Sequence, residues 1–262
     1  MDPFGIEFGK TLGQLVGEDR VAFAWVALFW HLAAVVVVYL VIRYGNRYRR
    51  LFAAYFALDY LWLVGFVGIW VSVELYERMG AVALAVYGAT PVFLLVIALQ
   101  WLRELRAPTL DLDFRHIEKW RLLVAVPLAV WGFWYPPYIY GVRLVFDPAE
   151  LLFGAYGLMG CPTTMVALSL LFLVYPAGGR QLFHLLTAYA VFVGAAMVAL
   201  LYVPDIPFFA LGVASLALVG WVRHRDRSVE RNTRPATPSP TEESAEDSPK
   251  LRADASKGRQ NR

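Results

Sequence analysis

Asp59 is the residue whose chemistry fits its surroundings least, because it lies within the long apolar stretch 51–73. A carboxylate inside a membrane is costly and normally faces the interior of a helix bundle or a water-filled cavity. His31 lies near the middle of a second apolar stretch, 21–42, and the short connection places both side chains within about one helical turn of the same depth. His31 and Asp59 are therefore candidates for a hydrogen-bonded pair, either a proton-coupling relay or a polar lock between two helices, and the sequence leaves open whether they touch.

The run MGCPTTM, residues 159–165, contains two residues that weaken a helix. Pro162 has no backbone N–H to donate, and Gly160 costs conformational entropy in the preceding turn. We expect the stretch 151–175 to be interrupted here, with Pro162 at the first position of a new helix and free amides lining a cavity. The candidate pocket at this broken helix consists of Met159, Gly160, Cys161, Pro162, Thr163 and Thr164.

Cys161 is the single cysteine of the chain, and its neighbours give it a soft-ligand character. A thiolate flanked by the thioethers of Met159 and Met165 would suit Cu(I). No second cysteine, histidine-rich loop or methionine-rich tract supplies further ligands. The sequence therefore favours no metal site, with Cu(I) handling as the alternative.

Enzyme signatures are missing from the sequence: it has no HExxH, GxSxG, phosphate loop or nucleotide fingerprint. The connection DLDFRHIEKW, residues 111–120, combines carboxylates with a histidine, and we interpret it as a solvated loop. All lysines lie outside the apolar stretches, which excludes a retinal Schiff base. His31 and His184 lie at different depths, which argues against a bis-histidine haem. We expect no catalytic residues and no cofactor, and favour a protein that is not an enzyme.

The elements that position these residues follow from the composition. The chain of 262 residues is 59% hydrophobic and has a mean hydropathy of +0.52, which is typical of a protein whose main solvent is lipid. About 20 apolar residues of helix cross the hydrocarbon core, and backbone groups in lipid must be paired within the helix. Stretches of suitable composition cover residues 21–42, 51–73, 81–102, 122–142, 151–175, 182–203 and 206–222. We therefore predict an all-α polytopic bundle of seven transmembrane helices.

The orientation follows from the positive charges of the connections, because Lys and Arg concentrate on the cytoplasmic side. The connections after the first, third, fifth and seventh stretches carry Arg43, Arg47, Arg49, Arg50, Arg103, Arg106, Arg115, Lys119, Arg121, Arg180, Arg223, Arg225, Arg227, Arg231 and Arg234. The other connections carry only Arg78 and Arg143. We predict the N-terminus outside and the C-terminus in the cytoplasm of a multi-pass protein of the cell membrane.

Three segments make up the predicted domain organisation. Residues 1–20 form an outer segment with the spacing of a short interfacial amphipathic helix, and 21–222 form the transmembrane domain. Residues 223–262 are too polar to bury a core and are predicted to be a disordered basic cytoplasmic tail. The tail is expected to meet anionic lipid headgroups at the inner face. The net charge of +3 indicates no nucleic-acid partner, and the oligomeric state is left open.

A family resemblance is carried by the N-terminal PFGIEF, the Tyr-Pro near the end of the fourth stretch, and FGAYGLMGCPTTMVALSLLFL. The chain resembles an uncharacterised multi-spanning membrane family, domain of unknown function 6064, from about residue 3 to the seventh stretch. The resemblance implies the multi-spanning fold and a local importance of Cys161, Pro162, Thr163 and Thr164. The chain departs from the family in having no histidine in the loop before the fifth stretch. The family brings no activity with it.

Two functional hypotheses follow from the residues. The first is a small-solute or proton-linked transporter, in which His31 and Asp59 are coupling groups and the broken fifth stretch lines the path. The alternative is a membrane sensor or scaffold that binds a partner or lipid through its outer pocket or its basic tail.

Overall fold

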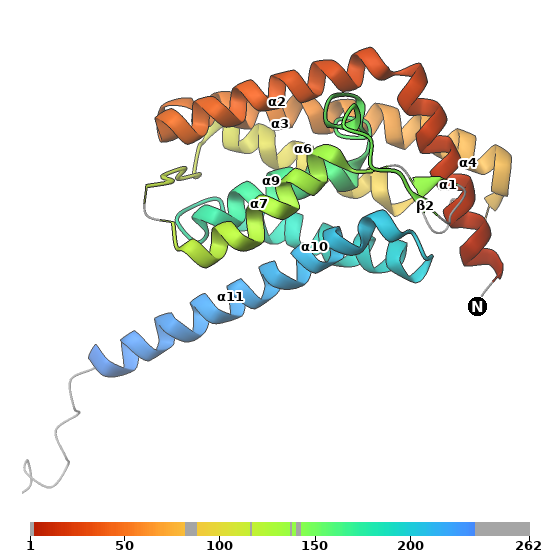
Figure 1. The fold of residues 1–262 in the computed structure, drawn as a ribbon. Coiled ribbons are helices and arrows are strands. Elements are labelled where there is room, and N and C mark those ends of the chain that lie inside the picture. Colours follow the sequence, from red (N-terminus) through yellow and green to blue (C-terminus); the bar gives the residue numbers. More distant parts are fainter. Residues whose placement is uncertain (1–2, 82–87, 116, 137, 140–142, 234–262) are drawn as a thin grey trace, which may run out of the picture. The chain divides into compact units, whose positions relative to one another are not determined.

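The computed structural model describes residues 3–81, 88–115, 117–136, 138–139 and 143–233 (Figure 1). The chain divides into two units, 1–220 and 221–262. The described part is almost entirely helical, in agreement with the predicted all-α class. Its β-structure consists of the two-residue antiparallel strands β1 (Tyr138–Ile139) and β2 (Arg143–Leu144), together with an isolated bridge between Tyr156 and Met159.

The N-terminal half is a series of helices that fold back at Gly45. Helix α1 (Pro3–Ala22) precedes α2 (Ala24–Tyr44), and the 3₁₀ turn η1 (Gly45–Tyr48) joins α2 to α3 (Arg49–Gly65). Gly45 ends α2 with a φ of 57°, a backbone conformation that glycine adopts without strain. A π-helical segment, η2 (Phe66–Val71), then continues α3 into α4 (Ser72–Met79).

Helix α6 (Ala89–Arg106) packs against α3 through aromatic side chains. The rings of Phe56 and Trp101 are stacked with centroids 4.9 Å apart, and Phe52 meets the same indole edge-on. All three side chains are fully buried. This layer therefore fixes the face of α3 that points into the protein and, with it, the position of Asp59.

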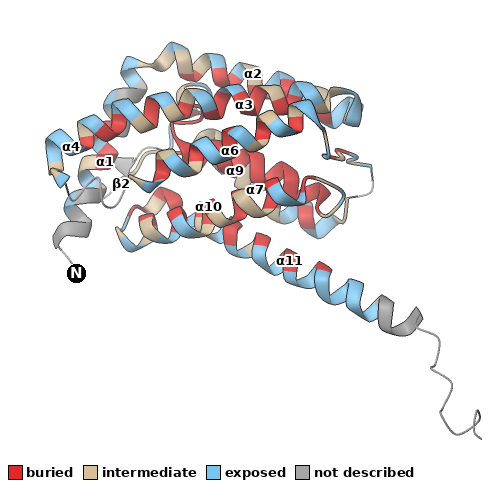
Figure 2. Cartoon of the chain, turned by 180° about the vertical axis from the view of Figure 1, so that it is seen from behind, coloured by how far each residue is buried: buried red, intermediate tan, exposed pale blue. Residues whose placement is uncertain are grey.

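Helix α9 (Gly160–Val174) is the centre of the bundle, and all of its residues are buried (Figure 2). A helix that is apolar on every side is suited to a protein core or to lipid, and here neighbouring helices cover it. Helix α7 (Lys119–Trp134) approaches it so closely that a Cβ on Gly132 would lie 2.9 Å from the carbonyl oxygen of Pro162. Helix α10 (Arg180–Ala199) covers another side of it.

The interruption expected within 151–175 is present, but the helix that follows it begins two residues earlier than predicted. The short helix α8 (Glu150–Phe153) ends before Gly154, and α9 begins at Gly160 rather than at Pro162. Met159 precedes α9 in an extended conformation. Pro162 thus lies within the first turn, where its missing N–H has no intrahelical acceptor to lose.

Three described helical stretches are long and apolar enough to cross a membrane: Ala24–Met79, Arg180–Ala199 and Val203–Ser228. The first contains the reversal at Gly45, so it comprises two helical arms. Helix α9 is apolar but has only 15 residues. The composition and these helices together indicate a membrane protein. Each of the seven predicted stretches contains a helix, although the fourth ends at Trp134 because Tyr135 turns into the left-handed region.

The C-terminal end of the chain differs from the predicted boundary at residue 223. After the 3₁₀ turn η3 (Val203–Asp205), helix α11 (Ile206–Thr233) continues beyond the apolar stretch. The added turns are rich in arginine, which has a high helix propensity, so an established helix extends into them at little cost. Residues 234–262 of the predicted tail lie outside the described residues. The described side chains at 223–228 are exposed.

Candidate functional site

Asp59 lies on α3 and is fully buried, with a relative exposure of 0%. Neither of its carboxyl oxygens has a hydrogen-bond partner among the described residues. The carboxyl group lies close enough to Tyr55, Tyr60 and Tyr156 to act on their hydroxyl groups electrostatically. An unpaired polar group in such a place costs about 1–3 kcal/mol, and more if it is charged. Asp59 is therefore expensive for the fold and has no evident structural use.

His31 is also buried, and the hydrogen bond between His31 and Asp59 that the sequence left open is not formed. Its Nδ1 lies 2.8 Å from the carbonyl oxygen of Ala27, one turn earlier on α2, and its Nε2 lies 3.1 Å from that of Phe133 near the end of α7. Both ring nitrogens are thus engaged by backbone acceptors. A neutral imidazole can donate to one of the two carbonyls, whereas an imidazolium donates to both. His31 therefore joins α2 to α7 rather than to α3.

Tyr156 interacts with both His31 and Asp59. Its ring meets the His31 ring edge-on with centroids 5.2 Å apart, and its hydroxyl lies 2.8 Å from that of Tyr55. Tyr55 in turn donates to the carbonyl oxygen of Trp30 at 3.1 Å. Since the hydroxyl hydrogen of Tyr55 is used in this way, Tyr156 donates to Tyr55. Neither hydrogen is left for Asp59, which explains why a carboxyl group among hydroxyls remains without a donor.

The threonines of the CPTT run tie the start of α9 to its surroundings. The hydroxyl of Thr164 lies 2.7 Å from that of Tyr60 on α3, and Thr163 accepts a hydrogen bond of 3.1 Å from the amide of Gly157. Gly157 has a φ of 73°, and a Cβ there would lie 2.4 Å from the Cβ of Trp30. The loop before α9 therefore passes α2 at a distance that only glycine allows, and Thr163 holds it there.

Cys161 is buried and belongs to a second polar group at the start of α9. Its thiol is hydrogen-bonded to the carboxyl group of Asp205 in η3, and the hydroxyl of Tyr135 donates to the same carboxyl group at 2.6 Å. Tyr189 on α10 lies against Cys161 and faces Gly160, where a Cβ would be 2.5 Å from the tyrosine oxygen. Within the described residues, no three His, Cys, Asp or Glu side chains are grouped so that they could hold a metal ion.

The residues of the predicted pocket therefore lie together, and all of them are buried: Met159, Gly160, Cys161, Pro162, Thr163 and Thr164. Their described contacts are packing and hydrogen bonds to α3, α10, η3 and the preceding loop. The start of α9 brings Asp59 and Asp205 into one polar region, because Tyr60 interacts electrostatically with both Asp59 and Cys161. We call Asp59, Tyr60, Thr164, Cys161 and Asp205 the α9 polar series.

Sequence reasoning missed the tyrosines and Asp205. Aromatic residues are so frequent here that a single tyrosine carries no signal of its own. Asp205 lies in a connection, where a carboxylate needs no explanation, although its position immediately before an apolar stretch is a signal that could have identified it.

No family model, no curated protein and no solved structure matches the chain.

Proposed function

We propose that this chain is a seven-helix multi-pass protein of the cell membrane, with its N-terminus outside and its C-terminus in the cytoplasm. The apolar helices Ala24–Met79, Arg180–Ala199 and Val203–Ser228 support membrane insertion. The helices found within each of the seven apolar stretches support the number of spans. The arginines after every odd-numbered stretch support the orientation. Kinship with domain of unknown function 6064 is part of the same proposal and has the CPTT run as its support.

We further propose that the protein is a proton-linked transporter in which Asp59 takes up and releases the coupled proton. The observation that carries this proposal is the carboxyl group of Asp59, which is fully buried and lacks a hydrogen-bond partner among the described residues. Ionisable residues of this kind in membrane proteins mark ion and proton pathways. A structural carboxyl group would be expected to use its oxygens, as Glu104 does with the amide and hydroxyl of Thr109.

The α9 polar series supplies groups along which a proton can move. Tyr60 lies beside Asp59 and contacts Thr164 at 2.7 Å, and its hydroxyl also interacts with Cys161. Cys161 is bonded to Asp205. Hydroxyl and thiol groups both donate and accept, so each can pass a proton on by exchanging one hydrogen bond for another. The series contains two hydrogen-bonded steps, from Tyr60 on α3 to Thr164 on α9 and from Cys161 on α9 to Asp205 in η3.

Infrared difference spectroscopy on the protein in nanodiscs tests the proton-exchanging role of Asp59. A jump in pH should change a carboxylic C=O band that the Asp59→Asn variant lacks. In proteoliposomes with an enclosed pH-sensitive dye, the wild type should admit protons under an imposed potential and Asp59→Asn should not. Glu104→Gln is the matched control, because it also neutralises a buried carboxyl group but one that is fully engaged. Equal proton entry in wild type and Asp59→Asn would end the proposal.

The alternative function is that of a membrane sensor or scaffold. The extension of α11 beyond the apolar stretch, to Thr233, supports this alternative. Arg223, Arg225 and Arg227 are exposed on the part of the helix beyond residue 220, and the Arg225 guanidinium lies 5.7 Å from the Trp221 ring centroid. Such a helix end can bind anionic lipid headgroups. Substituting the three arginines by glutamine should abolish retention of phosphatidylglycerol in native mass spectra if the alternative is correct, and should leave it unchanged otherwise.

A further inference from the structure

A cavity of about 300 Å³ lies at the other end of α9, away from the α9 polar series. Its walls come from the connection before α7, the first turn of α7 and the end of α9: Asp113, Ile117, Glu118, Arg121, Leu173, Val174, Tyr175, Pro176 and Ala177. The lining combines one guanidinium, two carboxylates and several apolar side chains. Nothing in the proposed proton pathway uses these groups, so the cavity is an independent feature.

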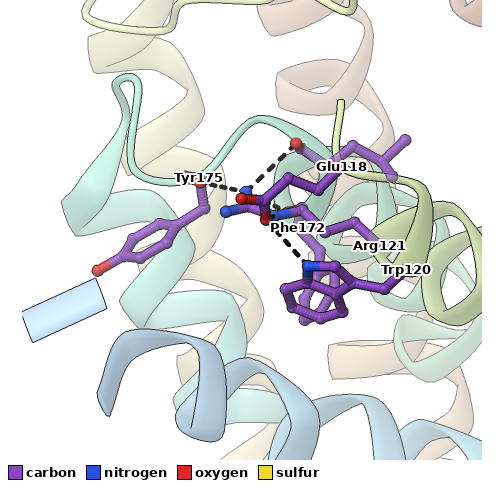
Figure 3. A network of polar contacts seen from close by, with 6 residues as sticks. Glu118, Trp120, Arg121, Phe172 and Tyr175 are labelled. Atoms are coloured by element: carbon purple, nitrogen blue, oxygen red, sulfur yellow. Dashed lines mark hydrogen bonds and ion pairs between the residues drawn. The ribbon is translucent and has the colours of Figure 1, made fainter. Parts of the chain in front are cut away.

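Arg121 is the central polar residue of the cavity and is 8% exposed (Figure 3). Its Nη1 donates to the carbonyl oxygens of Phe172, Leu173 and Tyr175, and its Nε donates to Glu118 at 3.0 Å. The last carbonyls of a helix have no intrahelical donor, so Arg121 satisfies the buried end of α9. Its second terminal nitrogen, Nη2, has no partner among the described residues. Nη2 is not enclosed by the protein, so its two hydrogens are accessible to a ligand in the cavity.

The two carboxylates give the cavity an opposite charge beside this guanidinium. Glu118 bonds Arg121 and accepts a hydrogen bond from Trp120 at 2.9 Å. Asp113 is exposed, and the one described bond of its side chain runs from the amide of Arg115 to Oδ1. Since Glu118 balances Arg121, Asp113 leaves the cavity with a surplus negative charge. A simple anion would be repelled by the carboxylates, and a simple cation would leave Nη2 unpaired.

We propose that this cavity binds a zwitterion with a phosphodiester and a primary ammonium group, the chemistry of a phosphoethanolamine headgroup. The phosphodiester accepts hydrogen bonds from Nη2 of Arg121, a geometry that guanidinium groups favour. The ammonium group donates to the carboxylate of Asp113. Ile117, Leu173 and Pro176 supply the apolar wall that a glycerol backbone and the first methylene groups would contact.

The position of Trp120 makes a lipid the natural source of the headgroup. Trp120 is 42% exposed and lies two residues after the cavity residue Glu118, and such amphipathic rings concentrate at the membrane–water interface. The guanidinium of Arg121 lies 5.6 Å from the same ring. A free glycerophosphoethanolamine offers the same polar groups without the acyl chains, so the experiment includes it as a competitor.

Native mass spectrometry of the full chain released from nanodiscs tests the proposal. Discs contain equal amounts of phosphatidylethanolamine, phosphatidylcholine and phosphatidylglycerol. We expect one retained phosphatidylethanolamine, preferred over phosphatidylcholine by about ten-fold, because a trimethylammonium group cannot donate the hydrogen bond to Asp113. Asp113→Asn should remove the preference. Asp147→Asn is the matched control, because Asp147 is equally exposed and its Oδ1 likewise accepts the amide two residues later, at 2.9 Å.

Each outcome of the lipid-retention experiment either supports or overturns the proposed headgroup site. Equal retention of the ethanolamine and choline lipids, preferential retention of phosphatidylglycerol, or an unchanged preference in Asp113→Asn would overturn the proposal. A preference that soluble glycerophosphoethanolamine displaces supports recognition of the headgroup alone, and a preference that it does not displace supports recognition of the intact lipid. The folded fraction of Asp113→Asn is checked by its circular dichroism against that of Asp147→Asn, since neither variant removes the Arg121 contacts of α9.

Discussion

Replacing Asp59 by leucine should make the protein more stable, which is the opposite of the usual effect of changing a buried residue. Leucine has the same branching as aspartate, so two methyl groups take the place of the two carboxyl oxygens. Those oxygens have no hydrogen-bond partner among the described residues, so no bond is lost. Removing unpaired buried polar atoms avoids a desolvation cost of about 1–3 kcal/mol. We expect the free energy of unfolding to rise by about this amount, less any cost of the slightly larger side chain.

The measurement is a reversible unfolding titration with sodium dodecyl sulfate in mixed micelles, followed by circular dichroism. Asp59→Asn is the companion variant, because it removes the charge but keeps two polar atoms in the same place, and it should gain less than Asp59→Leu. A loss of about 1 kcal/mol or more in Asp59→Leu would refute the reasoning. It would mean that Asp59 has a partner in the membrane and is a polar lock, the role that the sequence left open.

Three other substitutions test neighbouring features of the structure. A double-mutant cycle of Tyr60→Phe and Thr164→Val should give a coupling free energy of about 0.6–1.7 kcal/mol, since their hydroxyls lie 2.7 Å apart; additivity would show that the bond is absent. Gly157→Ala should lose at least about 2 kcal/mol in the same titration, because its φ is 73° and its Cβ would meet another side-chain carbon at 2.4 Å, whereas Gly17→Ala, with nothing within 4 Å, should not be destabilised. Arg121→Ala should lose about 1–3 kcal/mol by leaving the carbonyls at the end of α9 unpaired, and an unchanged unfolding midpoint would contradict its capping role.

The helical class was predictable because it follows from composition and the need to pair every backbone group in lipid. The break before α9 was predictable for a local reason: Gly160 and Pro162 weaken any helix that contains them. The start of α9 at Gly160 was not, because it depends on Met159 being held in an extended conformation by the loop around Gly157. That loop is shaped by its contact with Trp30, which is distant in the sequence.

The partner of His31 could not be predicted from depth alone. Equal depth of His31 and Asp59 is compatible with any rotation of the two helices about their axes, and the sequence does not fix that rotation. The carbonyl oxygen that engages His31 belongs to Phe133, near the point where Tyr135 ends α7. A helix end offers free carbonyls, and these attract a donor more strongly than a neighbouring helix whose backbone is fully paired.

The structural role of Arg121 also could not be predicted from the sequence. The sequence presents it as one of many basic residues of the inner face, where a charge is expected and needs no further explanation. In the folded protein its guanidinium binds the carbonyls at the end of the most deeply buried helix. A count of charges could not distinguish Arg121 from its exposed neighbours, because the difference is that the last carbonyls of α9 need a hydrogen-bond donor. The segment after this buried helix of 15 residues supplies the amides of Tyr175 and Ala177 to the carbonyl oxygens of Leu171 and Val174. Arg121 supplies the donor for the carbonyls of Phe172 and Leu173.

The two ends of α9 therefore explain most of the buried polar residues around it. At its start, the hydroxyls of Thr163 and Thr164 bond the preceding loop and α3, and Cys161 bonds Asp205. At its end, Arg121 bonds the last carbonyls. Each of these groups gains a partner that the fold would otherwise leave unpaired. Among the described residues Asp59 satisfies no other group, although it lies among the same side chains. A buried carboxyl group that costs stability and has no partner among the described residues is the observation on which the proposed proton exchange depends, because such a group can take up and release a proton.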